Sequence, residues 1–224
     1  MNAEARDIFR ASFPAHGVLL GLDMPLDDDE ARAATEVVQR IATETATRWE
    51  HTPGTLGSTA LRARILDEAG EALDQLGLVH WALSADGDVL ASGSPRPRRT
   101  PDPGEPLTPF FGEPWLASVA TDLGRRVADV GLAGTPGYPA ALTVRHRGDE
   151  DTRRTVAILA PSARVGDELA GLILGTRGEP GEEAEAAVTV RGAAALLVRA
   201  DGSLFITPGW PAAGSPWVSP GHRP

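Results

Sequence analysis

The sequence predicts an α+β fold, an antiparallel sheet that carries helices on one face. Two segments, 28–49 and 59–76, place apolar residues at the helical period of about 3.6 residues. Two others, 79–94 and 195–209, share one plan: an apolar run, Ala-Asp-Gly, one polar residue and a second apolar run. Asp-Gly favours tight turns, so each of these segments predicts a β-hairpin. The connections between strands are short, which favours antiparallel pairing.

The N-terminal region predicts a short helix over 2–13 that ends before Pro14, and then a strand over 18–22. The acidic run 27–30 precedes the helix over 28–49, where carboxylates cap the first turn and complement its dipole. Four carboxylates could instead hold Mg²⁺ or Ca²⁺. Their contiguous spacing lacks the alternation of a calcium loop, so capping is the favoured interpretation.

The helix over 59–76 is followed by Gly77, the residue type typical of a position just past a helix C-terminus. Beyond the first hairpin the pattern predicts these elements: a helix over 115–130, strands over 140–147 and 154–161, a segment at 165–175 that fits a helix or a strand, and a strand over 187–191 that leads into the second hairpin.

Three parts are expected along the chain. An N-terminal helical region, 1–58, packs on an α+β core, 59–207, and a tail of Pro, Gly and Trp occupies 208–224. The core is interrupted at 93–114 by a proline-rich loop. Its PxxP spacing could serve as a docking peptide, but a plain surface loop is the simpler interpretation.

Composition excludes several classes of protein. The net charge of −10 argues against a nucleic-acid binder and against anionic membrane surfaces. No cysteine is present, so thiolate chemistry and cysteine-ligated metals are excluded. All 21 basic residues are arginine, as codon use in a high-GC bacterium would produce. Residues 1–13 do not form a signal peptide, and a soluble, cytoplasmic protein is expected.

No motif dictates a reaction, so we predict no catalytic residue, no cofactor and no metal site. Asp86 and Asp201 form a tempting acidic pair, but Asp-Gly is the preferred composition of a hairpin turn. The stretch 166–168, Gly-Asp-Glu, is explained by a turn before an amphipathic segment.

A pocket between the sheet and its helices is an alternative that sequence motifs would miss. Its expected lining is His80, Trp81, Trp115 and His146, with the two histidines on strands of one sheet. In the tail, Trp210 and Trp217 are expected to pack back on the body or to bind a partner protein.

The order helix, hairpin, helix, two strands over 59–160 resembles that of roadblock/longin-type regulatory modules, with profilin-like PAS and GAF sensors as neighbours. The resemblance is carried by the helix 59–76, the hairpin HWALSADGDVLASG, the helix 115–130 and the strands at 140–147 and 154–160. It implies a module without catalytic activity that dimerises or docks on a partner such as a GTPase or kinase.

The leading functional prediction is therefore a non-catalytic regulatory or protein-interaction module that self-associates or docks on a partner protein. The alternative is a small-molecule-binding protein or enzyme with the apolar pocket described above. A third hypothesis is a structural subunit of a larger assembly. Whether any reaction is catalysed stays open at this stage.

Overall fold

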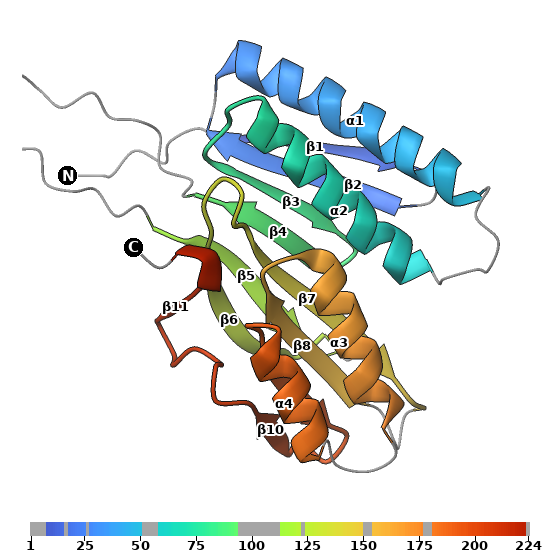
Figure 1. Cartoon of the computed structure of the whole chain (residues 1–224), viewed down its shortest axis with the longest axis vertical. Coiled ribbons are helices and arrows are strands. Elements are labelled where there is room, and N and C mark those ends of the chain that lie inside the picture. Colours follow the sequence, from blue (N-terminus) through green and yellow to red (C-terminus); the bar gives the residue numbers. More distant parts are fainter. Residues whose placement is uncertain are drawn as a thin grey trace, which may run out of the picture.

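Figure 1 shows the computed structural model of the chain, which describes residues 8–15, 18–25, 27–50, 58–93, 113–121, 124–149, 154–176 and 181–222. A large sheet of eight antiparallel strands has the order β1-β2-β3-β4-β7-β8-β9-β10. The bounds of these strands are Ile8–Ala15, Val18–Pro25, Trp81–Ala85, Asp88–Ser92, Ala140–Arg147, Arg154–Ala160, Ala194–Arg199 and Leu204–Ile206.

A second, three-stranded sheet has the order β11-β6-β5, and its β11 lies parallel to β6. These strands are β5 (Trp115–Ala120), β6 (Arg126–Ala133) and β11 (Pro216–Val218). The helices are α1 (Asp28–Glu50), α2 (Ser58–Gln75), α3 (Ala163–Gly175), α4 (Glu182–Val190) and a single 3₁₀ turn, Pro220–His222. No described helix is long and apolar enough to span a membrane.

The chain is arranged in three layers, with the large sheet in the middle. Side chains of β2–β4 that face the helices form one apolar cluster with α1 and α2, and those of β8 and β9 form another with α3 and α4. Residues of the opposite face pack against the small sheet and Trp217. In Figure 1 all four helices lie on the same side of the large sheet. The predicted α+β class with helices on one face is confirmed.

The large sheet is built from two similar units, each with the order ββααββ. The first contains β1, β2, α1, α2, β3 and β4, and the second contains β7, β8, α3, α4, β9 and β10. Antiparallel pairing of β4 with β7, with Leu90 opposite Ala141, joins the units into one continuous sheet. We call this line of contact the seam.

The helix ends correspond between the two units. Asp27 accepts a hydrogen bond from the backbone N–H of Glu30 at the start of α1, as predicted for the acidic run, and Ser162 accepts one from Val165 at the start of α3. The second helix of each unit ends at a glycine with positive φ, Gly77 or Gly192.

After each of these glycines the next N–H bonds to a carbonyl five residues earlier, Leu78 to Leu73 and Ala193 to Val188, which is the Schellman arrangement. An Asp-Gly hairpin then follows at the same distance along the chain. The two hairpins therefore occupy equivalent places in two similar units.

The two hairpins differ in their turns. Asp86 and Gly87, with φ of 44° and 93°, connect the paired residues Ala85 and Asp88 as a two-residue type I′ turn. In the second hairpin the N–H of Arg199 bonds to the carbonyl of Ser203, so the connection is one residue longer.

The predicted helix over 115–130 is wrong, because this segment forms the antiparallel pair β5 and β6. Trp115, Ala117 and Val119 are buried, whereas Leu116 between them is 82% exposed, which is the two-residue period of a strand. Ala, Val and Leu recur here at spacings that fit both the helical period of 3.6 residues and the strand period of two, so the pattern alone does not distinguish a helix from a strand. The turn between the strands contains Gly124 at a φ of 69°.

Two further local predictions are wrong. Residues 8–13 of the predicted helix 2–13 belong to edge strand β1, where Pro14 is tolerated, and 2–7 lie outside the described residues. Most of the expected strand 187–191 belongs to α4. The ambiguous segment 165–175 is helical, since Ser162 caps α3 and its apolar face packs on β8.

Candidate functional site

A group of charged side chains lies at the seam, where α2 and α3 meet the joined strands. It consists of Arg62 on α2, Asp86 in the β3–β4 turn, Asp88 on β4, Arg145 on β7 and Asp167 on α3. We call these five residues the seam cluster. They come from both ββααββ units, so the site exists only once the two units have joined.

Arg145 is the centre of the seam cluster. Its Nη1 and Nη2 donate to the two carboxylate oxygens of Asp88 at 2.5 and 2.8 Å, a bidentate pair. On the other side, Nε and Nη2 donate to Oδ1 of Asp167 at 3.0 and 2.7 Å. The three side chains are only 11%, 1% and 15% exposed. One guanidinium therefore bridges two carboxylates in a place that little water reaches.

The backbone around this triad explains its position. The N–H of Val144 also donates to Asp88, so β7 holds the carboxylate from two directions. Thr143, fully buried, stands on the same face of β7 as Arg145 and packs against Gly166 at the start of α3. Because Gly166 has no Cβ, α3 approaches β7 closely enough for Asp167 to reach Arg145.

Burial sets the protonation balance of the triad. Desolvation raises the pKa of Asp88, and the hydrogen bonds and charge of Arg145 only partly oppose that rise. Burial also works against the charge of Arg145, but its hydrogen bonds to Asp88 and Asp167 outweigh that effect and raise the pKa of the guanidinium. Arg145 is thus a permanent cation held by its two partners.

Arg62 has hydrogen-bonding capacity that the described residues do not use. Its Nη1 donates to Asp86 at 2.8 Å, and the side chain is 16% exposed. Its Nε is buried and has no hydrogen-bond partner among the described residues. A buried donor without a partner costs free energy, and such donors occur where a ligand or a water completes the contact.

A second buried carboxylate, Asp67, ties α2 to the start of α3. It accepts hydrogen bonds from the backbone N–H groups of Ala163 and Arg164 at 2.7 and 3.1 Å, and from Nε of Arg164 at 2.9 Å. Burial raises the pKa of Asp67 against the lowering effect of these bonds. The side chain caps the helix, so its role is structural.

Sequence reasoning missed the seam cluster. The predicted turn at 166–168 is wrong, because these residues lie in α3, from which Asp167 faces Arg145. Asp86 does serve in a turn, as predicted, and also pairs with Arg62. One signal was present in the sequence. Arg145 lies on a predicted strand at a position of the apolar face, and an arginine at such a position is buried only when it has partners.

The structure does not bring His80 and His146 together. His80 precedes β3 at the end of the sheet where Ala91 pairs with Ala140, whereas His146 lies near the other end of β7. At roughly 3.3 Å per residue, the span from Ala140 to His146 is about 20 Å. His146 is exposed and lies 2.9 Å from the hydroxyl of Thr155 through its Nδ1.

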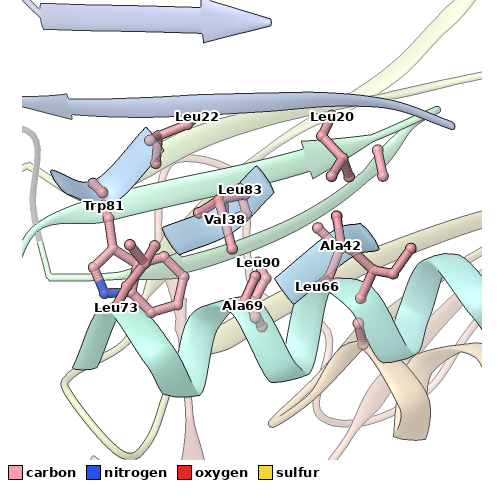
Figure 2. Packing of buried hydrophobic residues seen from close by; sticks show 14 of the residues in the cluster. Leu20, Leu22, Val38, Ala42, Leu66, Ala69, Leu73, Trp81, Leu83 and Leu90 are labelled. Carbon is pink, nitrogen blue, oxygen red and sulfur yellow. The ribbon is translucent and has the colours of Figure 1, made fainter. Parts of the chain in front are cut away.

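Trp81 and Trp115 lie on opposite faces of the large sheet. Figure 2 shows Trp81 beside Leu73 in the cluster under α2, where its indole donates to Asp74. Trp115 packs between the two sheets and donates to the carbonyl of Ser92. Neither side chain is exposed, and the four predicted lining residues do not converge on one point.

The tail tryptophans pack on the body of the same chain. Trp217 is 6% exposed and lies in β11, in the cluster between the two sheets, and Trp210 is partly buried against that cluster. A partner-binding role for these two residues stays a prediction. Within the described ranges, no group of three or more His, Asp or Glu side chains could hold a metal ion.

The fold thus consists of two ββααββ units joined in one sheet, with a small three-stranded sheet packed on the other face. No protein-family model matches the sequence, and no curated protein matches it. Solved structures of ApbE proteins do match, and two of them are named as flavin or flavinyl transferases.

Flavin transferase ApbE from Vibrio cholerae matches 90% of this chain and 97% of its own, at 10% identity and a TM-score of 0.55. The ApbE protein from Thermotoga maritima matches the same shares at 11% identity and a TM-score of 0.57. The apo form of flavinyl transferase ApbE from Pseudomonas stutzeri matches 93% and 97%, at 12% identity and a TM-score of 0.53. The chain therefore has an ApbE-like fold.

The predicted resemblance to roadblock/longin, profilin-like, PAS or GAF modules is wrong. The fold neighbours are ApbE structures that span about nine-tenths of the chain. The resemblance depended on a helix over 115–130 that does not exist, since this region is the hairpin of the small sheet. The prediction of a non-catalytic regulatory module depended on the same resemblance and is wrong with it.

Proposed function

We propose that this protein binds a flavin nucleotide and belongs functionally with the flavin transferases, as an enzyme that moves a flavin group to an acceptor. The observation that carries the proposal is the fold match over 90–93% of the chain to proteins named as flavin transferases from different bacteria. It favours the alternative, considered from the sequence, of a small-molecule-binding protein or enzyme.

Within the seam cluster, Arg62 is the side chain that would contact the charged part of such a ligand. A flavin nucleotide carries phosphate, and arginine is the side chain best suited to bind phosphate through several donors. The unpartnered Nε of Arg62 fits this role, because a phosphate oxygen would satisfy a buried donor that the described residues leave without one. Asp86, on the other side of the guanidinium, holds it in position.

The direct test is flavin binding to the purified chain. We expect FMN and FAD to bind saturably, with one site per chain, measured by quenching of flavin fluorescence and by calorimetry. Riboflavin, which lacks phosphate, should bind more weakly. Absence of saturable binding of all three flavins to folded protein would refute the proposal.

A matched pair of variants on α2 tests the assignment of Arg62. Arg62→Met should weaken FMN binding by roughly tenfold or more, the loss of one charge-assisted contact. Arg64→Met is the control, because the pair that Arg64 forms within the described residues is with Glu68 on the same helix, and Arg64 is 46% exposed. Equal affinities of the two variants for FMN would show that Arg62 does not contact the phosphate. Such a result would not contradict flavin binding itself.

Transfer is tested separately from binding. The chain is incubated with FAD and with a flavin-accepting protein, and the acceptor is examined for flavin fluorescence after denaturing electrophoresis. A fluorescent acceptor band that depends on the chain is the expected result. Binding without transfer would reduce the proposal to a flavin-binding protein.

A further inference from the structure

The carboxylates of Asp88 and Asp167 converge on a single nitrogen atom. Nη2 of Arg145 lies 2.8 Å from Oδ2 of Asp88 and 2.7 Å from Oδ1 of Asp167. Ca²⁺ binds carboxylate oxygens at about 2.3–2.6 Å, so shifts of a few tenths of an ångström separate this geometry from that of a shared ion. The position of Nη2 thus has the surroundings of a cation site.

The burial of these groups favours a cation at this point. The carboxylate of Asp88 is 1% exposed and that of Asp167 is 15% exposed. Two carboxylates brought together in such a place repel each other unless a positive charge lies between them. The charge of Arg62 also acts on Asp88, but Arg62 is already paired with Asp86.

A further buried oxygen lies on the same face of β7 as Arg145. Thr143, two residues before Arg145 on the same face of β7, is fully buried, and its hydroxyl has no hydrogen-bond partner among the described residues. It packs against Gly166, the residue next to Asp167. Carboxylate and hydroxyl oxygens together are the hard ligands that divalent cations prefer.

We propose that Arg145 is a built-in substitute for a bound metal cation: its Nη2 occupies a cation position between Asp88 and Asp167, and the two carboxylates share its single positive charge in place of an exchangeable divalent ion. Two consequences follow. The native protein binds no divalent cation at the seam, and removal of the guanidinium opens a site for one. Both consequences concern the protein without any flavin.

The test measures Mn²⁺ binding to the full chain in the absence of flavin, by electron paramagnetic resonance of the free ion and by the midpoint of thermal unfolding. For the native protein we expect no saturable binding and the same midpoint in Mn²⁺ and in EDTA. Arg145→Ala should bind one Mn²⁺ per chain, and its unfolding midpoint should rise with Mn²⁺ concentration. Ca²⁺ is the second probe, because it tolerates irregular geometry.

Two further variants make the result specific. Arg145→Lys keeps a positive charge and should remain insensitive to Mn²⁺. Arg145→Ala combined with Asp167→Asn should lose Mn²⁺ binding, by roughly tenfold or more, since affinity depends on the number of charged ligands. If Arg145→Ala does not fold, Arg145→Gln, an uncharged side chain with a donor for Asp88, replaces it.

Either of two results would overturn the proposal. One is a native protein that binds Mn²⁺ in a way that Asp167→Asn abolishes. The other is a folded Arg145→Ala or Arg145→Gln protein that binds no Mn²⁺. Neither result bears on flavin binding, so this inference and the proposed function can fail independently.

Discussion

The close approach of α3 to β7 predicts that replacing Gly166 even by alanine destabilises the protein. A Cβ added at Gly166 would overlap the hydroxyl of Thr143 and lie 2.9 Å from the Cβ of that residue. Thr143 is β-branched and fully buried, so its side chain cannot rotate away. The helix would have to move outward, and Asp167 would move away from Arg145 with it.

The expected change in the free energy of unfolding for Gly166→Ala combines two opposing effects. Alanine in place of a helical glycine stabilises by up to about 1 kcal/mol. Overpacking a buried contact costs about 1–3 kcal/mol. Gly166→Ala should therefore lower the free energy of unfolding by about 0–2 kcal/mol, a net loss where the helix propensity alone predicts a gain.

The same helix offers a matched control. A Cβ at Gly171 would meet no heavy atom within 4 Å, so Gly171→Ala should keep the full gain in helix propensity. Urea unfolding of both variants, followed by circular dichroism, should place Gly171→Ala about 1–3 kcal/mol above Gly166→Ala. Two variants of equal stability would refute the close packing of α3 on Thr143, and with it the geometry of the seam cluster.

Two other predictions concern pH and the tail. Burial raises the pKa of Asp67, so its carboxyl keeps the proton to a higher pH in the native state than in the unfolded state. The protonated carboxyl therefore stabilises the native state fully below the unfolded pKa of about 3.9. This stabilisation is lost as pH rises through the raised pKa of the native state. Urea unfolding across this window should show a smaller loss of stability with rising pH for Asp67→Asn than for the native protein, and identical pH profiles would contradict the assignment. Trp217→Ala, at a side chain that is 6% exposed between the sheets, should cost about 3–5 kcal/mol, whereas Trp210→Ala, at a partly buried side chain, should cost less. A Trp217→Ala protein as stable as Trp210→Ala would show that β11 contributes little to the core.

Local signals carried much of the fold prediction. The helices α1 and α2 and the strands β7 and β8 lie where their periodicity placed them, and both Asp-Gly segments form hairpins. These elements have long apolar patterns or distinct end signals, such as the acidic residues before α1 and Gly77 after α2. Such signals act within one helix or one hairpin, so they can be read before the fold is known.

The errors fell where contacts with other strands decide the conformation. Residues 115–130 contain Ala, Val and Leu at spacings that suit either a helix or a strand, and contacts with the large sheet select the strand. Strand β1 depends in the same way on its pairing with β2, from Ile8 opposite Pro25 to Ala15 opposite Val18. Pairing energy of this kind overrides local propensity and leaves no mark within the segment itself.

By itself, the sequence determined the class of fold, the main helices and the two equivalent Asp-Gly hairpins, because these follow from the periodicity and turn chemistry of neighbouring residues. Only the tertiary structure decided the site. Asp88, Arg145 and Asp167 are far apart in the chain and meet because β4 pairs with β7 and because Gly166 lets α3 approach that strand. Their common role arises from a shared buried position, and burial is a property of the folded chain that no single segment possesses.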